Sequence, residues 1–291
     1  MLKCSYIILI YNNESTIPKL IDSLEKINGN FRKEFIFIDD GSTDQSLQML
    51  KERANNLPRC TIVTQDHLGP AVSVNKAFGL VTGDYIHFLQ GDEVIHPEAT
   101  TALIDACLKF GTNVAFGLKK SNIPLANTLN LSYKLIDLPI NNILNNNPEA
   151  IRNIGASASL IHHDLIEKIR AADETIYSQN MSLSLKCGKY SKFAFLNEVV
   201  ATNDLNDSNK INSDNKFESY NNLKAIYNFA KDNPDIFNNL LPDLLKPLRD
   251  ETSNVTNKIN YSLKYFTSKY IKSTTIEKIL KLYKAEIDKL F

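Results

Sequence analysis

FIFIDDGSTDQS, residues 35–46, is an apolar run that leads directly into two aspartates, a glycine and small hydroxyl residues. A nearly continuous apolar run is typical of a strand buried on both faces, as in a parallel sheet covered by helices. Ligands of such sheets bind beyond the carboxyl ends of the strands, where polar side chains can reach them. We therefore expect Asp39 and Asp40 to lie at a binding edge, while Asp44 would serve as a helix cap.

Apolar runs and amphipathic segments alternate through the first 118 residues. Between the first two runs, the apolar residues Ile17, Leu20, Ile21 and Leu24 recur at helical spacing. The alternation predicts an α/β fold with a mostly parallel sheet flanked by helices. The expected strands cover residues 5–10, 34–39, 60–64, 84–90 and 113–117.

The chain after residue 118 is less regular. Residues 119–202 contain a small-residue loop at 155–159, a helical segment at 177–190 and a strand-like run at 192–196. The last part, 203–291, begins with a polar stretch of low complexity that is typical of a linker and continues as a helical extension. An apolar stripe from Ile276 to Leu290 would pack on the domain, join two copies as a homodimer or contact a membrane surface.

Charge and cysteine content narrow the class of protein. The 33 basic and 33 acidic residues of the 291-residue chain leave no net charge that would attract nucleic acid, so a small molecule or a glycan is the favoured partner. The four cysteines are too scattered for a metal knuckle and fit reduced thiols of a cytoplasmic protein. No run approaches the roughly 18 apolar residues of a transmembrane helix, so membrane contact would be peripheral.

A second acidic group ends another predicted strand, in GDYIHFLQGDEVIHP at residues 83–97. Here Gln90 and Gly91 precede Asp92 and Glu93. An acidic pair at a strand end can hold Mg²⁺ or Mn²⁺ together with the phosphates of a substrate, although a solvated turn would have the same composition. A glycine-rich loop, which dinucleotide-dependent oxidoreductases and many nucleotidyltransferases carry after the first strand, is absent from YNNEST at residues 11–16.

Taken in order, four segments resemble family 2 glycosyltransferases of the GT-A fold. They are YNNE at 11–14, IDDGSTD at 38–44, HLGPAVSVN at 67–75 and GDYIHFLQGDE at 83–93. The likeness is best over the first 110 residues or so. Farther on, GASAS at 155–159 and DETIYSQNMSLSLK at 173–186 are similar to the acceptor-side loop and to the helix that carries the catalytic carboxylate.

The resemblance implies transfer of a sugar, with inversion, from a nucleoside-diphosphate sugar to a hydroxyl of a glycan, lipid-linked or protein acceptor, in surface polysaccharide or glycoconjugate synthesis. Residues 1–118 would form the nucleotide-sugar half and residues 119–202 the acceptor half. A divalent cation would bind Asp92 with help from Glu93, and Gln179 and Asn180 occupy the catalytic position. The donor would contact Tyr11, Asn13, Glu14, Asp39, Asp40, His67, Gln90 and Gly91.

Three positions depart from the family pattern. Gln90 replaces the first aspartate of the D-x-D motif, Val74 replaces an arginine, and Asn180 stands where a carboxylate is expected. An asparagine cannot take a proton near neutral pH, as a general base must. Either the enzyme is active through another group, with His162, His163, Asp173 and Glu174 as candidates, or the chain is a nucleotide-sugar-binding partner subunit without catalytic activity.

Overall fold

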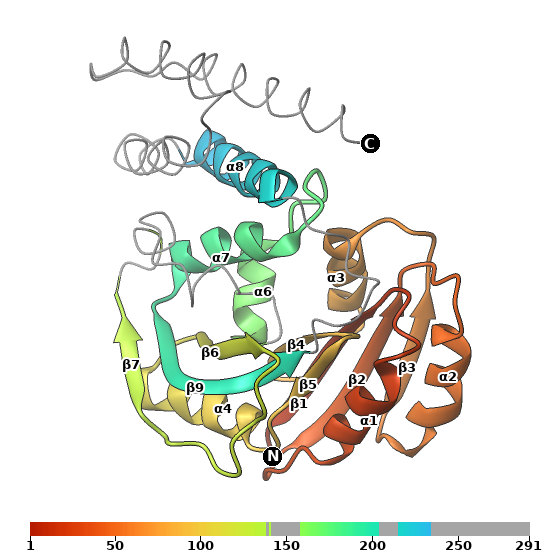
Figure 1. The fold of residues 1–291 in the computed structure, drawn as a ribbon. Helices are drawn as coiled ribbons and strands as arrows, with labels where there is room; N and C mark the ends of the chain where they lie inside the picture. Colours follow the sequence, from red (N-terminus) through yellow and green to blue (C-terminus); the bar gives the residue numbers. More distant parts are fainter. Residues whose placement is uncertain (138–139, 141–157, 204–214, 234–291) are drawn as a thin grey trace.

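The computed structural model describes residues 1–137, 140, 158–203 and 215–233 (Figure 1). Nine strands are present: β1 Lys3–Ile10, β2 Arg32–Asp39, β3 Cys60–Thr64, β4 Tyr85–Gln90, β5 Glu93–Ile95, β6 Val114–Ser121, β7 Tyr133–Ile136, β8 Ser159–His162 and β9 Phe193–Asn203. The helices are α1 Ile17–Glu25, α2 Ser46–Arg53, α3 Pro70–Phe78, α4 Ala99–Phe110, α6 His163–Ile169, α7 Gln179–Tyr190 and α8 Asn215–Asp232, with a short 3-10 turn at Ala54–Asn56. No helix in this described part is long and apolar enough to cross a membrane.

All strands join one sheet, in the order β3-β2-β1-β4-β8-β6-β9-β5, with β7 paired to β9. The first four strands are parallel, as the apolar runs predict. Beyond them the sheet is mixed: β8 runs antiparallel to both β4 and β6, and β5 and β7 run antiparallel to β9. The fold is therefore α/β as expected, and the fully parallel part of the sheet is confined to strands β1 to β4.

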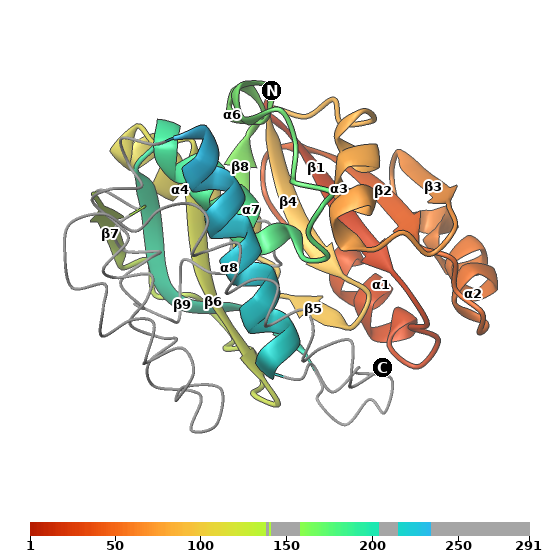
Figure 2. The same ribbon diagram turned by 90° about the horizontal axis from the view of Figure 1, so that it is seen from above.

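Alternation along β2 explains why its apolar run is continuous. Phe35 and Phe37 belong to a core formed with α1, α2 and α4, while Ile36 and Ile38 belong to a second core formed with α3, α6 and α7. Figures 1 and 2 show these two sets of helices on opposite faces of the sheet. Successive side chains of a strand point to opposite faces, so a strand covered on both sides needs apolar residues throughout.

Most predicted elements are found close to their expected bounds. The run at 192–196 is the start of a longer strand, Phe193–Asn203. Inside the predicted linker, the structure describes Asn203 as the last residue of β9 and a helical segment that begins at Asn215. The apolar stripe of residues 276–290 lies outside the described residues, and so do its predicted contacts.

Glu34 anchors the end of the parallel sheet opposite the binding edge. Its carboxylate accepts hydrogen bonds from Ser5 Oγ at 2.5 Å, from Lys3 Nζ at 2.9 Å and from Thr82 N at 3.1 Å. Burial raises the pKa of this carboxyl, but the hydrogen bonds from Ser5, Lys3 and Thr82 outweigh burial and hold the pKa below its usual 4.5. The ionised carboxylate thus ties β1, β2 and the segment before β4 together.

Candidate functional site

A cavity of about 260 Å³ opens at the carboxyl ends of β1 and β4, beside the loop that follows β2. This is the edge at which open α/β sheets bind their ligands. We call it the edge cavity. It is lined by Leu9, Ile10, Tyr11, Asn12, Asn13, Asp40, His67, Pro70, Ser73, Gln90, Gly91, Asp92 and Tyr177.

Asn13 holds the loop between β1 and α1 in shape. Its Oδ1 accepts a hydrogen bond from Tyr11 N at 2.9 Å, and its backbone N donates to Ser46 Oγ at 2.6 Å. Gly91 packs against the same side chain, because a Cβ at this position would lie 2.2 Å from Asn13 Oδ1. Thr16 Oγ1 then donates to Gly91 O at 2.7 Å. Asn13 and Gly91 therefore position the loops on both sides of the edge cavity.

Glu14 and Asp44 join the β1–α1 loop to the loop that follows β2. Glu14 Oε2 accepts from Gln45 N at 2.9 Å, and Asp44 Oδ2 accepts from Glu14 N at 3.2 Å. Asp44 Oδ1 also accepts from Ser46 N at 2.9 Å, which agrees with its predicted capping role. Glu14 does not line the edge cavity, so its predicted contact with a nucleotide finds no support in its position.

Asp40 lines the edge cavity and organises the loop after β3. Oδ1 accepts from Gln65 Nε2 at 2.7 Å and from Leu68 N at 2.9 Å, while Oδ2 accepts from Gly69 N at 2.9 Å. His67 Nδ1 lies 3.0 Å from Oδ2. With the side chain almost fully buried, these contacts occupy most of its lone pairs. The main structural role of Asp40 is therefore to fix the shape of residues 65–69.

Asp39 is the more available of the two neighbouring carboxylates. It is 2% exposed, and among the described residues its Oδ1 has no hydrogen-bond partner. A buried acceptor without a partner is costly and calls for an explanation, such as a ligand that donates to it. Asp39 is not among the residues that line the edge cavity, but it precedes Asp40, which is.

Three rings form the aromatic part of the edge cavity. Tyr11 and His67 stack with their ring centroids 4.0 Å apart and their planes 20° from parallel. Tyr177, which sequence reasoning did not single out, lines the cavity from the loop before α7. Burial, with the nearby Asp40 and Tyr11, raises the pKa of the Tyr177 phenol, so it stays protonated. Its only signal in the sequence is its place just before the helix that resembles the catalytic one.

Gln90, Asp92 and Glu93 follow one another closely but have different surroundings. Gln90 and Asp92 line the edge cavity, and Asn203 Nδ2 donates to Asp92 Oδ2 at 3.1 Å. Glu93 is fully buried outside the cavity, where Lys119 Nζ lies 2.5 Å from Oε1 and Gln90 N donates to Oε2 at 2.7 Å. The predicted contact of Glu93 with a cation therefore finds no support in its position, because both of its oxygens are engaged.

A metal would have to rely on Asp92 and on a ligand. The part of the chain that the structure describes contains no group of three or more histidine, cysteine or acidic side chains arranged to hold an ion. Magnesium, however, needs only one or two carboxylates when substrate phosphates supply the other oxygens. Asp92 at the edge cavity fits that smaller requirement.

Gln179 and Asn180 begin α7 but do not line the edge cavity. Gln179 is 2% exposed, and Asn180 Oδ1 is buried with no partner among the described residues. The candidate substitutes for a missing base also lie elsewhere. His162 Nδ1 accepts from Asp164 N at the start of α6, and Asp173 and Glu174 line a different cavity.

Val74, at the position where the family pattern has an arginine, is a core residue. Val74 is fully buried on α3 among residues of the second core. Its neighbour Asn75 instead accepts from Ala172 N at 2.7 Å and donates to Glu174 Oε1 at 2.8 Å. Asn75 thus fixes the loop before α7 against α3, and Val74 does not line the edge cavity.

Comparison with known families matches residues 5–169 to Glycosyl transferase family 2. The uncharacterized glycosyltransferase YibD of Escherichia coli is 32% identical over 39% of this chain and 33% of its own length. The poly(ribitol-phosphate) beta-glucosyltransferase of Bacillus spizizenii is 27% identical over 64% of this chain and 30% of its own length. The chain thus spans about a third of the length of these curated relatives.

Among solved structures, TarS 1-349 of Staphylococcus aureus in complex with UDP-GlcNAc superposes with a TM-score of 0.68 at 15% identity. The match covers 86% of this chain and 74% of that one. A structure of the same fragment in complex with UDP gives a TM-score of 0.65. At this level of identity the likeness shows the fold.

Proposed function

Since the chain belongs to glycosyl transferase family 2, we propose that it transfers a sugar, with inversion, from a nucleoside-diphosphate sugar to a hydroxyl group of a glycan or glycoconjugate. The observation that carries the proposal is the buried Oδ1 of Asp39, which has no hydrogen-bond partner within the described part of the chain, beside a cavity at the carboxyl edge of the sheet. That oxygen can accept a hydrogen bond from an N–H of the base or from a ribose hydroxyl.

Tyr11, Asp39 and Asp40 would each have a different role in holding the donor nucleoside. Tyr11 offers a ring face for stacking on the base. Asp39 accepts a hydrogen bond from the nucleoside, and Asp40 keeps residues 65–69 in place beneath it. UDP is the first nucleotide to try, because the solved neighbours were determined with UDP and UDP-GlcNAc.

The diphosphate would lie toward Gln90, Gly91 and Asp92. A Mg²⁺ or Mn²⁺ ion held by Asp92 and the phosphates would offset the charge that builds on the leaving group. Gln90 offers a neutral oxygen at this position, which binds a hard cation more weakly than a carboxylate would. We therefore expect weak binding of the metal without a donor and tighter binding with one.

The acceptor hydroxyl must lose a proton as the new bond forms. Asn180 can orient the acceptor through its unpartnered Oδ1 but cannot take that proton at neutral pH. The same feature supports a second candidate function, a nucleotide-sugar-binding partner subunit that does not turn over. The two candidates share the donor site and differ only in release of the nucleotide.

A turnover assay tests the proposal. The full chain is incubated with Mn²⁺ and with UDP-glucose, UDP-GlcNAc or the matching GDP and dTDP sugars, and release of the nucleoside diphosphate is followed. Poly(ribitol phosphate) is the first acceptor to add, because that polymer stands in the names of similar enzymes. Acceptor-dependent release supports the transferase. Binding of a donor without release supports the partner subunit, and failure to bind any donor contradicts both.

A further inference from the structure

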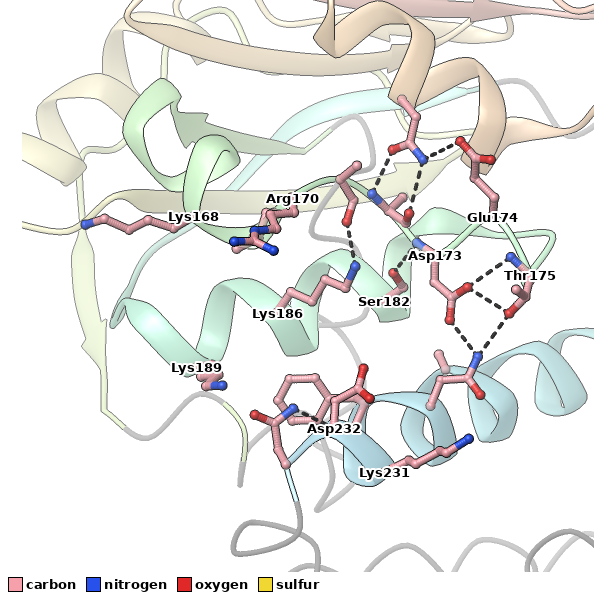
Figure 3. Close-up of a pocket in the computed structure, with 18 of the residues that line it drawn as sticks. Lys168, Arg170, Asp173, Glu174, Thr175, Ser182, Lys186, Lys189, Lys231 and Asp232 are labelled. Carbon is pink, nitrogen blue, oxygen red and sulfur yellow. Dashed lines mark hydrogen bonds between the residues drawn. The ribbon is translucent and has the colours of Figure 1, made fainter.

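A second and larger cavity, of about 930 Å³, lies between the end of α6, the loop before α7, and helices α7 and α8 (Figure 3). We call it the helical cavity. It has no lining residue in common with the edge cavity. The two are joined through one loop, since Thr175 lines the helical cavity and Tyr177 lines the edge cavity. The helical cavity plays no part in the donor chemistry described above.

The charged side chains of the helical cavity are only partly segregated, because Asp232 and Lys231 of α8 do not follow the separation. Its lining includes five basic and three acidic side chains, so it carries a positive balance in a chain with none. Figure 3 shows basic side chains gathered toward one end, namely Lys168, Arg170 and Lys189 with Lys186 near the middle. The opposite end carries Asp173, Glu174 and Thr175.

The carboxylates near the polar end are engaged by neutral groups. Asp173 Oδ1 accepts from Thr175 N at 2.9 Å, and its Oδ2 accepts from Asn228 Nδ2 at 2.6 Å. Glu174 Oε1 accepts from Asn75 Nδ2 at 2.8 Å. Among the described residues, no ion pair joins a basic side chain of this cavity to a carboxylate. Among the described residues, the cations of this cavity thus have no direct carboxylate partner, although Asp173 and Asp232 lie near Lys186.

Lys186 is the most buried cation of the group. Its Nζ donates to Ala171 O at 2.7 Å, which leaves further N–H groups for a ligand. Burial lowers the pKa of this amine, and the nearby Asp173 and Asp232 offset that effect only in part. An anion bound at Nζ would stabilise the charged form of the amine.

Arg170 and Ala171 sit in a backbone conformation that non-glycine residues rarely adopt. Their φ angles are 56° and 88°, and Arg170 N donates to Ile166 O as the left-handed cap of α6. Such residues keep this conformation only where the surrounding structure holds them in it. The turn directs the Arg170 side chain and the Ala171 carbonyl toward the same cavity.

We propose that the helical cavity binds a phosphorylated polyol or sugar, with Arg170, Lys186 and Lys189 holding the phosphate. A guanidinium can donate two parallel hydrogen bonds to a phosphate, and ammonium groups add charge without a fixed direction. At the other end, Thr175, Asn228 and the Asp173 carboxylate offer partners for hydroxyl groups. The proposal does not rest on sugar transfer, because it involves no residue of the edge cavity.

Calorimetric titration of the full chain with sn-glycerol 3-phosphate, inorganic phosphate and glycerol tests this site. Arg170→Gly removes the guanidinium and suits the positive φ of that position. Arg59→Gly is the matched control, because Arg59 is an exposed arginine at φ 50° that lines neither cavity. Loss of a charged hydrogen bond should weaken glycerol phosphate binding about tenfold or more in Arg170→Gly and leave it unchanged in Arg59→Gly.

Further titrations identify the molecule that carries the phosphate and control for a loss of binding caused by misfolding. Vesicles of phosphatidylglycerol replace the soluble probe, and binding that Arg170→Gly abolishes would place the phosphate on a lipid headgroup. Lys189→Gln gives an independent loss of affinity if Arg170→Gly lowers the melting temperature. UDP titration of the same variants should be unchanged, which separates this site from the donor site. Absence of binding by every phosphate probe, or equal loss in Arg59→Gly, would overturn the proposal.

Discussion

The loops at the carboxyl edge of the parallel strands and the segment that leads into α7 are built differently. Around the edge cavity, the side chains of Glu14, Asp40 and Asp44 accept hydrogen bonds from backbone N–H groups of other loops and hold these loops together. At the start of α7, the side-chain oxygen of Asn180 is buried without a partner among the described residues. The first region is organised for binding before a ligand arrives. The second, at the proposed base position, has an amide where a general base would need a carboxylate.

The largest effect should follow from Gly91→Ala. Its Cβ would lie 2.2 Å from Asn13 Oδ1, so the alanine must push Asn13 away from Tyr11 N and open the locked loops. A misplacement of about 1 Å at a catalytic site can lower the reaction rate about a hundredfold, and we expect a loss of that order in UDP release together with weaker UDP binding by calorimetry. Gly79→Ala is the control, because its nearest atom would be 3.5 Å away. Equal affinity in both variants would show that the loops are not locked in this way.

Next in size, Asp40→Asn should destabilise the fold and Asp39→Asn should not. The amide that replaces the Asp40 carboxylate would face N–H donors with an NH₂ group, at a cost of about 2 to 3 kcal/mol. Asp39 Oδ1 makes no such bond, so neutralising it should change the free energy of unfolding by less than about 1 kcal/mol. Urea denaturation of both variants measures the difference. A larger loss in Asp39→Asn would reverse the assigned roles.

A third prediction concerns the start of α7, where a carboxylate is introduced in place of Asn180. If Asn180 occupies the base position of a weakened transferase, Asn180→Asp should raise the turnover rate about tenfold or more without changing UDP affinity. Gln179→Glu places the new carboxylate one residue away and serves as the comparison. Steady-state rates of UDP release distinguish them. An active wild type whose rate Asn180→Asp leaves unchanged would mean that the base lies elsewhere.

The smallest effect concerns acid stability at the opposite end of the parallel strands. The lowered pKa of Glu34 means that its folded form binds protons less readily than its unfolded form. Its contribution is therefore complete above the usual carboxyl pKa of 4.5 and is lost as pH falls through the folded-state value. Melting temperatures between pH 7 and pH 3 should fall less steeply for Glu34→Gln. UDP affinity at pH 7 should stay the same, since Glu34 is remote from the edge cavity.

The parallel half of the fold could be predicted because its signals are local. A strand buried on both faces must be apolar throughout, as in residues 35–38, and the polar residues at its end mark the edge that binds. The mixed half gave weaker signals. The antiparallel pairing of β8 with β4 joins residues more than 70 positions apart, so no local turn motif in the sequence could indicate it.

The candidate site was predicted in part, for a physical reason. Tyr11, Asp40 and Asp92 line the edge cavity as expected, whereas Glu14 and Glu93 use their carboxylates to hold protein groups. A sequence shows that an acidic side chain is near an edge but not which way it points. Tyr177 was missed because it reaches the cavity from a loop that lies far away along the chain.

The central claim is that the nucleotide half binds a donor through Asp39, and titration of UDP with Mn²⁺ into wild type and Asp39→Asn tests it most directly. We expect the wild type to bind UDP. The variant, folded to the same extent, should bind UDP with an affinity lower by a factor of about ten or more, because a charged acceptor is lost. Equal affinity of the two proteins, or no binding of UDP by the wild type, would contradict the claim.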